Sequence, residues 1–440
     1  MRRFLQILQD TDDLIQISKP VDRKLQAAGI LKALEPRPVR LNSVTGSDLP
    51  VVGNLYCTKS NIARYFGLQP AQLIPFLLQA MEHPVPCPIV SHAPCQEVII
   101  EKPDLDLFPI LFHCERDGGN YISSGLVVAK HPVFGQNLDY HRIMQFSRTE
   151  MAVRVVKNRH FDQYLRELGQ VDIAVCIGNP PNLMLAGGIS IGIGKNELEI
   201  ANAMSPAPLV HAHSVDLMIP ADCEIVLEGT VYNDRRHCEG PFLDLTETYD
   251  VIRDEPIFEV KAISHRKNPI WQALLPGGLE HKMLMGTPRE PTIFQRVNEV
   301  TRCLDVNITP GGCSWLHAVV QIDRQTDGDG KKAIMAAFAG HSSLKHVAVV
   351  DADIDIYDPA QVEWAMATRF QADRDLVVLP GQHGSSLDPS AEPGTHLTAK
   401  VGFDLTKPEN STGKSFSHAA YPEVDVSTFL DDHKTSKLGK

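Results

Sequence analysis

The chain has 440 residues, 43% of them hydrophobic, and a formal net charge of −12 at pH 7. This length exceeds what one hydrophobic core usually organises, so two or more domains are expected. The acidic balance disfavours nucleic acid as a partner, because a phosphate backbone is bound by basic surfaces. The sequence contains no run of 18 apolar residues, which predicts that no segment spans a membrane.

The first residues and the cysteines bear on the cellular compartment. Residues 1–10 include two arginines but no continuous apolar core, so a first helix is expected there in place of a signal peptide. The nine cysteines are an odd number and include no CxxC pair, which is typical of reduced thiols and argues against a disulfide framework or a zinc cluster. These features predict a cytoplasmic protein.

Residues 1–97 are expected to form a small α+β domain. Helical spacing of apolar residues occurs at 4–14, 24–34 and 72–81. From 98 to 310 the pattern changes to short strands with alternating apolar residues, separated by Gly and Pro. This second segment is predicted to be a β-barrel or sandwich.

Residues 311–440 are expected to form a C-terminal α/β domain, because strands and helices alternate as in a parallel sheet. The predicted order is strand 316–322, helix 331–338, strand 346–350, helix 359–370 and strand 376–379. Asp358 is placed to cap the second helix, and Pro359 suits its first position. Beyond Gly381 the chain is rich in Gly, Ser, Pro and Asp, which predicts a wrap-around or subunit-contact arm.

Two carboxylates lie close together in the segment 236–244. Glu239 and Asp244 flank a Gly-Pro turn. On a rigid turn, two such groups can share proton transfer, since repulsion and burial favour the protonated form of one of them. An ordinary acidic turn is the alternative.

Four further side chains have types suited to ligand binding. Arg142 is a candidate for holding a carboxylate in a bidentate fork, or else a surface salt-bridge partner. Asn137, His160 and Glu197 are oxygen or imidazole donors of the kind that bind divalent metals, provided that the fold brings them together.

Six segments, taken in order, resemble the UbiD decarboxylase family over nearly the whole chain. The matching segments are Asn137 with Arg142, His160 eighteen residues after that arginine, Asn196-Glu-Leu-Glu-Ile-Ala201, the strand 224–229 with Glu239-Gly-Pro-Phe242, Lys345-His-Val-Ala-Val-Val-Asp-Ala-Asp-Ile-Asp355, and Trp364-Ala-Met-Ala-Thr-Arg369. The resemblance implies an α+β fold in which a central split β-barrel of FMN-binding type is flanked by the N-terminal α+β and C-terminal α/β domains.

The same resemblance implies a cofactor site for prenylated FMN. Its phosphate would be bridged to the protein by Mn²⁺ or a similar divalent ion, with K⁺ alongside, and Asn137, His160 and Glu197 would be the metal ligands. Arg142 and Lys345 would also contact the cofactor. A flavin prenyltransferase would supply the cofactor, and the chain would assemble as a homo-oligomer.

The family's catalytic Glu-Arg-Glu network corresponds here to Arg142, Glu239 and Asp244. Arg142 would orient the substrate carboxylate, and Asp244 would donate the proton with Glu239 as its partner. Two positions depart from the commoner family pattern: Leu243 stands where Gly is usual, and Asp244 replaces Glu.

The implied reaction is the reversible, non-oxidative decarboxylation of an aromatic, heteroaromatic or alkenoic acid. His281 and Arg289 lie in a segment that approaches the substrate in short-form members, where they would pair with a second anionic group; a local helix cap is the alternative for Arg289. Furan-2,5-dicarboxylate is the first choice of substrate, and trans-anhydromevalonate 5-phosphate is the alternative. A split-barrel flavin oxidoreductase and a non-catalytic flavin-binding subunit are the rival hypotheses from other classes.

Overall fold

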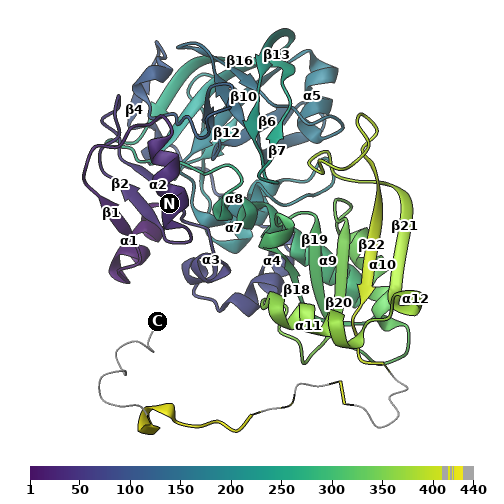
Figure 1. Ribbon diagram of the computed structural model, residues 1–440. Helices are drawn as coiled ribbons and strands as arrows, with labels where there is room; N and C mark the ends of the chain where they lie inside the picture. The colour runs from purple at the N-terminus through teal and green to yellow at the C-terminus, as the bar shows by residue number, and fades with distance from the viewer. Residues whose placement is uncertain (409–414, 417–418, 420, 430–440) are drawn as a thin grey trace.

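Two long antiparallel strands, β13 (Ile225–Glu239) and β16 (Arg253–His265), form the centre of a curled nine-stranded sheet. The sheet has the order β5-β8-β9-β16-β13-β10-β6-β7, with β4 paired to β16. In this computed structural model the sheet is the half-barrel at the top of Figure 1, and it confirms the expected α+β fold with a central split barrel. The other strands are β4 (Val98–Ile100), β5 (Asn120–Ile122), β6 (Leu126–His131), β7 (Gly135–Tyr140), β8 (Ile143–Gln145), β9 (Glu150–Val153) and β10 (Gln170–Ile177).

The alternating pattern of these strands places side chains in two cores. In β10, Ile173 and Val175 belong to the core inside the half-barrel, whereas Ala174 and Cys176 belong to the core shared with neighbouring helices. Those helices include α6 (Pro181–Ala186) and α7 (Glu197–Met204), and α5 (His160–Leu168) packs beside β10. The sheet is therefore buried on both faces.

The N-terminal segment packs against the barrel on the left of Figure 1. It contains the predicted helices and a small sheet with the order β1-β2-β3-β17, whose last strand (Trp271–Gln272) comes from much later in the chain. Its elements are α1 (Arg2–Asp10), β1 (Ile15–Ile17), α2 (Gln26–Leu34), β2 (Val39–Leu41), β3 (Val51–Gly53), α3 (Lys59–Phe66) and α4 (Leu73–Glu82).

The C-terminal domain has a five-stranded sheet with the order β18-β19-β20-β22-β21. The predicted alternation of strands and helices is confirmed, and the Asp358 side chain accepts a hydrogen bond from the Ala360 N–H at the start of α11. The elements are β18 (Arg302–Ile308), β19 (His317–Asp323), α10 (Asp329–Gly340), β20 (His346–Asp351), α11 (Pro359–Arg369), α12 (Ala372–Asp375), β21 (Leu376–His383) and β22 (Leu397–Asp404).

Two expectations for this domain need correction. Residues 302–308 fall in the segment that is predicted to end at 310, but they pair with β19 and so belong to the C-terminal sheet. Residues 397–404 fall within the predicted wrap-around or subunit-contact arm, but they form β22 between β20 and β21. The parallel pairing of β22 with β20, about fifty residues earlier in sequence, is a tertiary feature that the local pattern does not encode.

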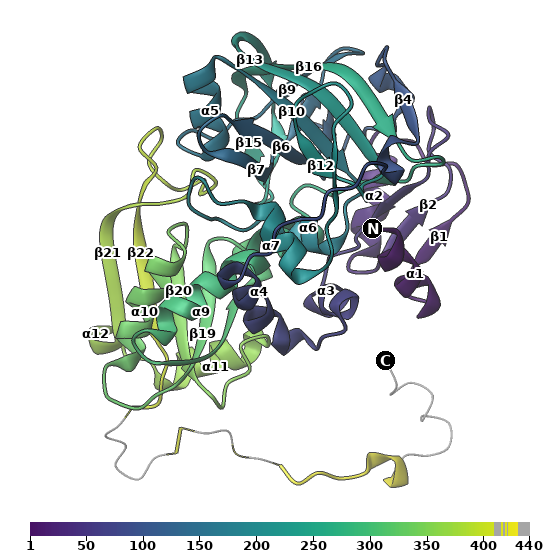
Figure 2. The ribbon, with the colours of Figure 1, turned by 180° about the vertical axis from the view of Figure 1, so that it is seen from behind.

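The structure describes residues 1–408, 415–416, 419 and 421–429. The predicted subunit-contact role of the polar tail therefore falls largely outside the described residues. Within them, no helix is long and apolar enough to cross a membrane. Figure 2, seen from behind, shows the loop between β21 and β22 reaching from the C-terminal domain towards the barrel.

A buried carboxylate fixes helix α8 (Leu279–Gly286), which borders the region between these domains. Glu280 accepts hydrogen bonds from the backbone N–H groups of Asn54, Leu55 and Tyr56 at 2.9, 2.9 and 3.2 Å. Its side chain is fully buried, and burial raises its pKa to about 8 although the three backbone donors oppose this. One side chain thus ties the start of α8 to the segment after β3.

We expect Glu280→Ala to lower the free energy of unfolding by about 3 kcal/mol or more, because three buried N–H groups lose their acceptor. Chemical denaturation at pH 6 measures the change. The matched control is Asp358→Ala, which removes one exposed helix cap and should cost about 1 kcal/mol. Equal destabilisation by the two substitutions would contradict the role given to Glu280.

Candidate active site

A cavity of about 1220 Å³ lies between the barrel and the C-terminal domain. The barrel contributes Asn137, Arg142 and His160 to its wall, and the C-terminal domain contributes Trp315 and the β21–β22 loop. Clefts between domains are common sites for small molecules and cofactors. All the predicted site residues except Glu239 and Lys345 line this cavity.

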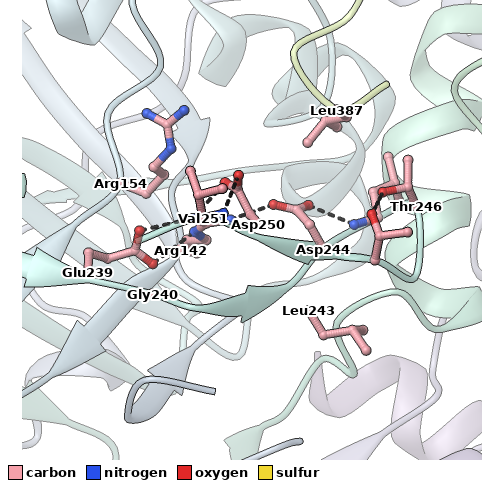
Figure 3. Close-up of polar contacts among 12 residues, drawn as sticks. Arg142, Arg154, Glu239, Gly240, Leu243, Asp244, Thr246, Asp250, Val251 and Leu387 are labelled. Atoms are coloured by element: carbon pink, nitrogen blue, oxygen red, sulfur yellow. Dashed lines mark hydrogen bonds and ion pairs between the residues drawn. The ribbon is translucent and has the colours of Figure 1, made fainter. Parts of the chain in front are cut away.

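The guanidinium of Arg142 is surrounded by carboxylates at the cavity wall (Figure 3). Its Nε and one NH2 hydrogen donate to the two carboxylate oxygens of Glu239, each at 2.9 Å. NH1 donates to Asp244 Oδ2 at 2.6 Å. The structure thus brings the three predicted catalytic residues into direct contact, and Arg142 is a buried ion-pair centre instead of a surface salt-bridge partner.

Glu239 lies on the side of this cluster that faces away from the cavity. Its side chain is fully buried, and the Tyr121 hydroxyl donates to its Oε1 at 3.0 Å. The turn that follows it is packed tightly, since a Cβ on Gly118 would lie 2.2 Å from the carbonyl oxygen of Gly240. Glycine at position 118 therefore allows the backbone to approach the Glu239 turn closely.

Asp250 is a third carboxylate on Arg142, which the sequence analysis missed. NH2 of Arg142 donates to Asp250 Oδ2 at 2.9 Å, and Arg253 donates to the same oxygen. Asp250 ends β15 (Tyr249–Asp250), which pairs with β14 (Phe242–Leu243) in the hairpin that also carries Asp244. No recognised motif extends to position 250, so no local pattern pointed to this residue.

The three predicted metal ligands lie close together. Asn137 is on β7, His160 begins α5 and Glu197 begins α7. His160 Nδ1 lies 3.0 Å from Asn137 Oδ1, and Glu197 Oε2 accepts from the N–H of Leu138, the next residue after Asn137. The fold therefore brings these three side chains together, as the predicted metal site requires.

The chemistry of this donor set fits a divalent cation. Asn137 Nδ2 is buried and has no hydrogen-bond partner among the described residues. Burial raises the pKa of Glu197 to about 8, although the Leu138 N–H opposes this. A carboxylate in such an environment gains most from a nearby positive charge, which would restore its ionised form.

His281 and Arg289 also face the cavity. His281 Nδ1 accepts from the Gly277 N–H at 3.1 Å, and burial lowers the pKa of the ring, so the neutral imidazole carries its proton on Nε2. Arg289 packs against the Trp315 ring at 5.4 Å. Burial and the nearby charge of Arg159 lower its pKa to about 10, and its buried Nε has no acceptor among the described residues.

Lys345 does not line the cavity itself. Its Nζ is 2.9 Å from Asp388 Oδ2 and also contacts Ser390. Both partners belong to the loop 384–396, parts of which line the cavity. In this structure Lys345 anchors that loop. Its expected contact with the cofactor stays a prediction.

Leu243, the departure from the usual glycine, does not enter the cavity. Its side chain points away from the Arg142 cluster in Figure 3. A Cβ on Gly277 would lie 2.8 Å from Leu243 Cδ2, so this leucine packs against the turn before α8. Leucine at position 243 therefore fills space beside Gly277 and does not narrow the cavity near Arg142.

Three family models match almost the whole chain. The N-terminal, Rift-related and C-terminal domains of 3-octaprenyl-4-hydroxybenzoate carboxy-lyase match residues 5–81, 89–279 and 282–405. Together they cover the N-terminal segment, the barrel and the C-terminal sheet.

Relatives with a named activity match over similar lengths. Anhydromevalonate phosphate decarboxylase of Methanothermobacter thermautotrophicus is 42% identical over an alignment of 423 residues, which covers 94% of this chain and 98% of that protein. The enzyme of the same name from Methanocaldococcus jannaschii is 41% identical over 410 residues, covering 91% and 96% of the two chains.

Solved structures agree with these matches. The UbiD-class enzyme HmfF from Pelotomaculum thermopropionicum, in complex with FMN, superposes with a TM-score of 0.93 at 33% identity, over 98% of this chain and 99% of that one. A 3,4-dihydroxybenzoic acid decarboxylase from Enterobacter cloacae superposes with a TM-score of 0.90 at 26% identity, over 97% and 98%. The chain therefore belongs to the UbiD family of carboxy-lyases.

Proposed function

We propose that this enzyme decarboxylates a phosphorylated alkenoic acid of the trans-anhydromevalonate 5-phosphate type. The observation that carries the choice is the half-buried Arg289, whose buried Nε has no acceptor among the described residues, in the same cavity as the Arg142 cluster. A substrate with a carboxylate and a second anionic group would meet both arginines. The relatives named anhydromevalonate phosphate decarboxylase favour the phosphorylated acid over furan-2,5-dicarboxylate, the first choice from sequence.

Prenylated FMN is the proposed cofactor. Solved UbiD-class HmfF structures contain FMN in one case and prenylated FMN in another. When bound, prenylated FMN supplies the electron sink that decarboxylation requires. Asn137, His160 and Glu197 would hold an ion such as Mn²⁺ to offset the flavin phosphate charge. K⁺, supply by a flavin prenyltransferase, homo-oligomeric assembly and a cytoplasmic location belong to the same proposal.

Residues of the chain itself bind the substrate carboxylate and donate the proton. Arg142 receives the substrate carboxylate and orients it, while Glu239 keeps the guanidinium in place from the buried side. As the bond to the carboxyl carbon breaks and carbon dioxide leaves, the carbon left behind needs one proton. Asp244 donates it from its carboxyl group and is reprotonated from solvent through the cavity.

His281 and Arg289 would hold the second anionic group. Because Nδ1 of His281 already accepts from Gly277, its Nε2–H is the hydrogen that faces an acceptor in the cavity. Arg289 adds a full positive charge from a position fixed by the Trp315 ring. Together they favour a phosphate over an uncharged end group.

The direct test measures carbon dioxide release by protein co-expressed with a flavin prenyltransferase and purified with Mn²⁺ and K⁺. We expect release from trans-anhydromevalonate 5-phosphate, and a loss of at least about 100-fold in kcat for Glu239→Gln, because the arginine fork loses one charged partner. Furan-2,5-dicarboxylate and the non-phosphorylated alkenoic acid serve as comparison substrates. Faster release from either would overturn the substrate assignment.

Arg289→Gln is expected to raise KM for the phosphorylated acid about 10- to 100-fold, because one charge-assisted contact is lost. Steady-state kinetics measure the effect. Arg296→Gln is the matched control, since Arg296 lies exposed on α9 (Glu290–Asn298) and pairs with Glu299. A fall in bound flavin at unchanged KM would instead assign Arg289 to the cofactor.

The metal content of a variant tests whether Asn137, His160 and Glu197 bind the divalent ion. We expect Glu197→Gln to retain less than about a tenth of the wild-type manganese, because an amide cannot replace the anionic ligand. Elemental analysis and flavin absorbance per chain provide the readouts. Glu199→Gln, two residues further along the same helix, is the control, and equal metal loss in both variants would argue against the assignment.

A further inference from the structure

The role of Asp250 is not explained by the three-residue network of Arg142, Glu239 and Asp244. Asp250 contacts Arg142 as directly as the other two carboxylates do, with 2.9 Å between NH2 and Oδ2. It lies opposite Phe242 in the hairpin, and the Phe242 ring packs against the guanidinium at 4.7 Å. The same short hairpin therefore supports the guanidinium both from its face and from one edge.

Asp250 is itself fixed from behind. Its Oδ2 also accepts from Arg253, and its Oδ1 accepts from the Val251 N–H at 2.9 Å. Burial opposes its ionisation, but the hydrogen bond from Arg253 and the charges of Arg142 and Arg253 outweigh this and hold the pKa of Asp250 below its usual range. Asp250 is thus a charged acceptor with little freedom to move.

The hydrogen bonds of Arg142 limit how it can bind a substrate. A guanidinium has five N–H donors, and described residues engage four of them: two on Glu239, one on Asp250 and one on Asp244. The one remaining donor is on NH1. A carboxylate that enters the cavity can reach two donors only by sharing or displacing the Asp244 contact.

Asp244 is the least firmly held of the three carboxylates. Glu239 is fully buried and forms a fork with Arg142, and Asp250 has Arg253 behind it. Asp244 has one bond to Arg142 and one from the adjacent Leu245 N–H. The NH1 edge is therefore the one that opens to a ligand.

We propose that Asp250, supported by Arg253, is a positioning residue that blocks the NH2 edge of Arg142, so that the substrate carboxylate binds at the NH1 edge beside Asp244. The inference rests on the proposed decarboxylation. Binding at that edge brings the departing carboxylate next to the acid that protonates the same carbon. Without Asp250, Arg142 has a second open edge, and substrate bound there lies away from the proton donor.

Steady-state kinetics of the holoenzyme test this role. Asp250→Asn is expected to lower kcat/KM about 10- to 100-fold, as for the loss of one charge-assisted hydrogen bond. Part of the loss falls on kcat, because some substrate binds at the wrong edge. Asp250→Glu keeps the charge and should restore most of the activity. Arg253→Gln, which removes the support behind Asp250, should change both constants in the same direction by a smaller factor.

Thr246→Ala is the matched control, because Thr246 lies in the same hairpin and bonds only to Thr248 among the described residues. It should leave both constants unchanged. Asp250→Asn within threefold of the wild type, or an equal loss in Thr246→Ala, would overturn the proposal. So would an Asp250→Glu variant as impaired as Asp250→Asn.

A crystal structure of Asp250→Asn separates this proposal from the proposed function. We expect the Arg142 guanidinium to turn, or its NH2 to lose its acceptor, whereas Arg142 in Thr246→Ala stays in place. An unmoved and fully paired Arg142 in Asp250→Asn would refute the positioning role. Absence of carbon dioxide release by the wild type would instead refute the proposed substrate, and the crystallographic result would still decide the role of Asp250.

Discussion

The site depends on one buried cation. Arg142 is nearly inaccessible to solvent, so its charge is tolerated only because carboxylates replace the lost water around it. Three acidic side chains and the face of Phe242 supply that environment. Because Glu239 is fully buried, an arrangement that left it without Arg142 would bury an unpaired charge, which costs several kcal/mol. The geometry of the cluster is therefore strongly constrained by the fold.

The half-barrel satisfies that constraint by joining distant segments. Arg142 follows β7, Glu239 ends β13, and the hairpin after it supplies both Asp244 and Asp250. Glu239 and Arg253 face each other at the ends of β13 and β16, so the longest strand pair of the sheet sets the spacing of the acidic groups. The tight packing of Gly118 against the turn that follows Glu239 holds this turn in place. Sheet register thus determines the electrostatics of the site.

The cavity depends equally on contacts between domains. Glu280 ties α8 to the N-terminal segment, which places His281 at the wall. Lys345 pairs with Asp388 and so holds the β21–β22 loop where it borders the cavity. Trp315 donates from its ring nitrogen to Ser385 in that loop and packs on Arg289. The C-terminal domain therefore borders the cavity and also orients Arg289, one of the arginines that line it.

The sequence by itself determined the types of the elements and the identities of most site residues. Alternating apolar residues predicted a strand-rich segment from residue 98 onwards, and the periodic pattern at 359–370 predicted α11. Ordered motifs selected Arg142, Glu239 and Asp244, because such patterns are local. Only the tertiary structure decided which side chains share a partner. The contact of Asp250 with Arg142 and the pairing of Lys345 with Asp388 each join residues that are distant in the sequence. Strand β22 likewise became evident only through its pairing with β20. These contacts depend on sheet register and domain packing over separations of 43 to 108 residues, which no short stretch of sequence encodes.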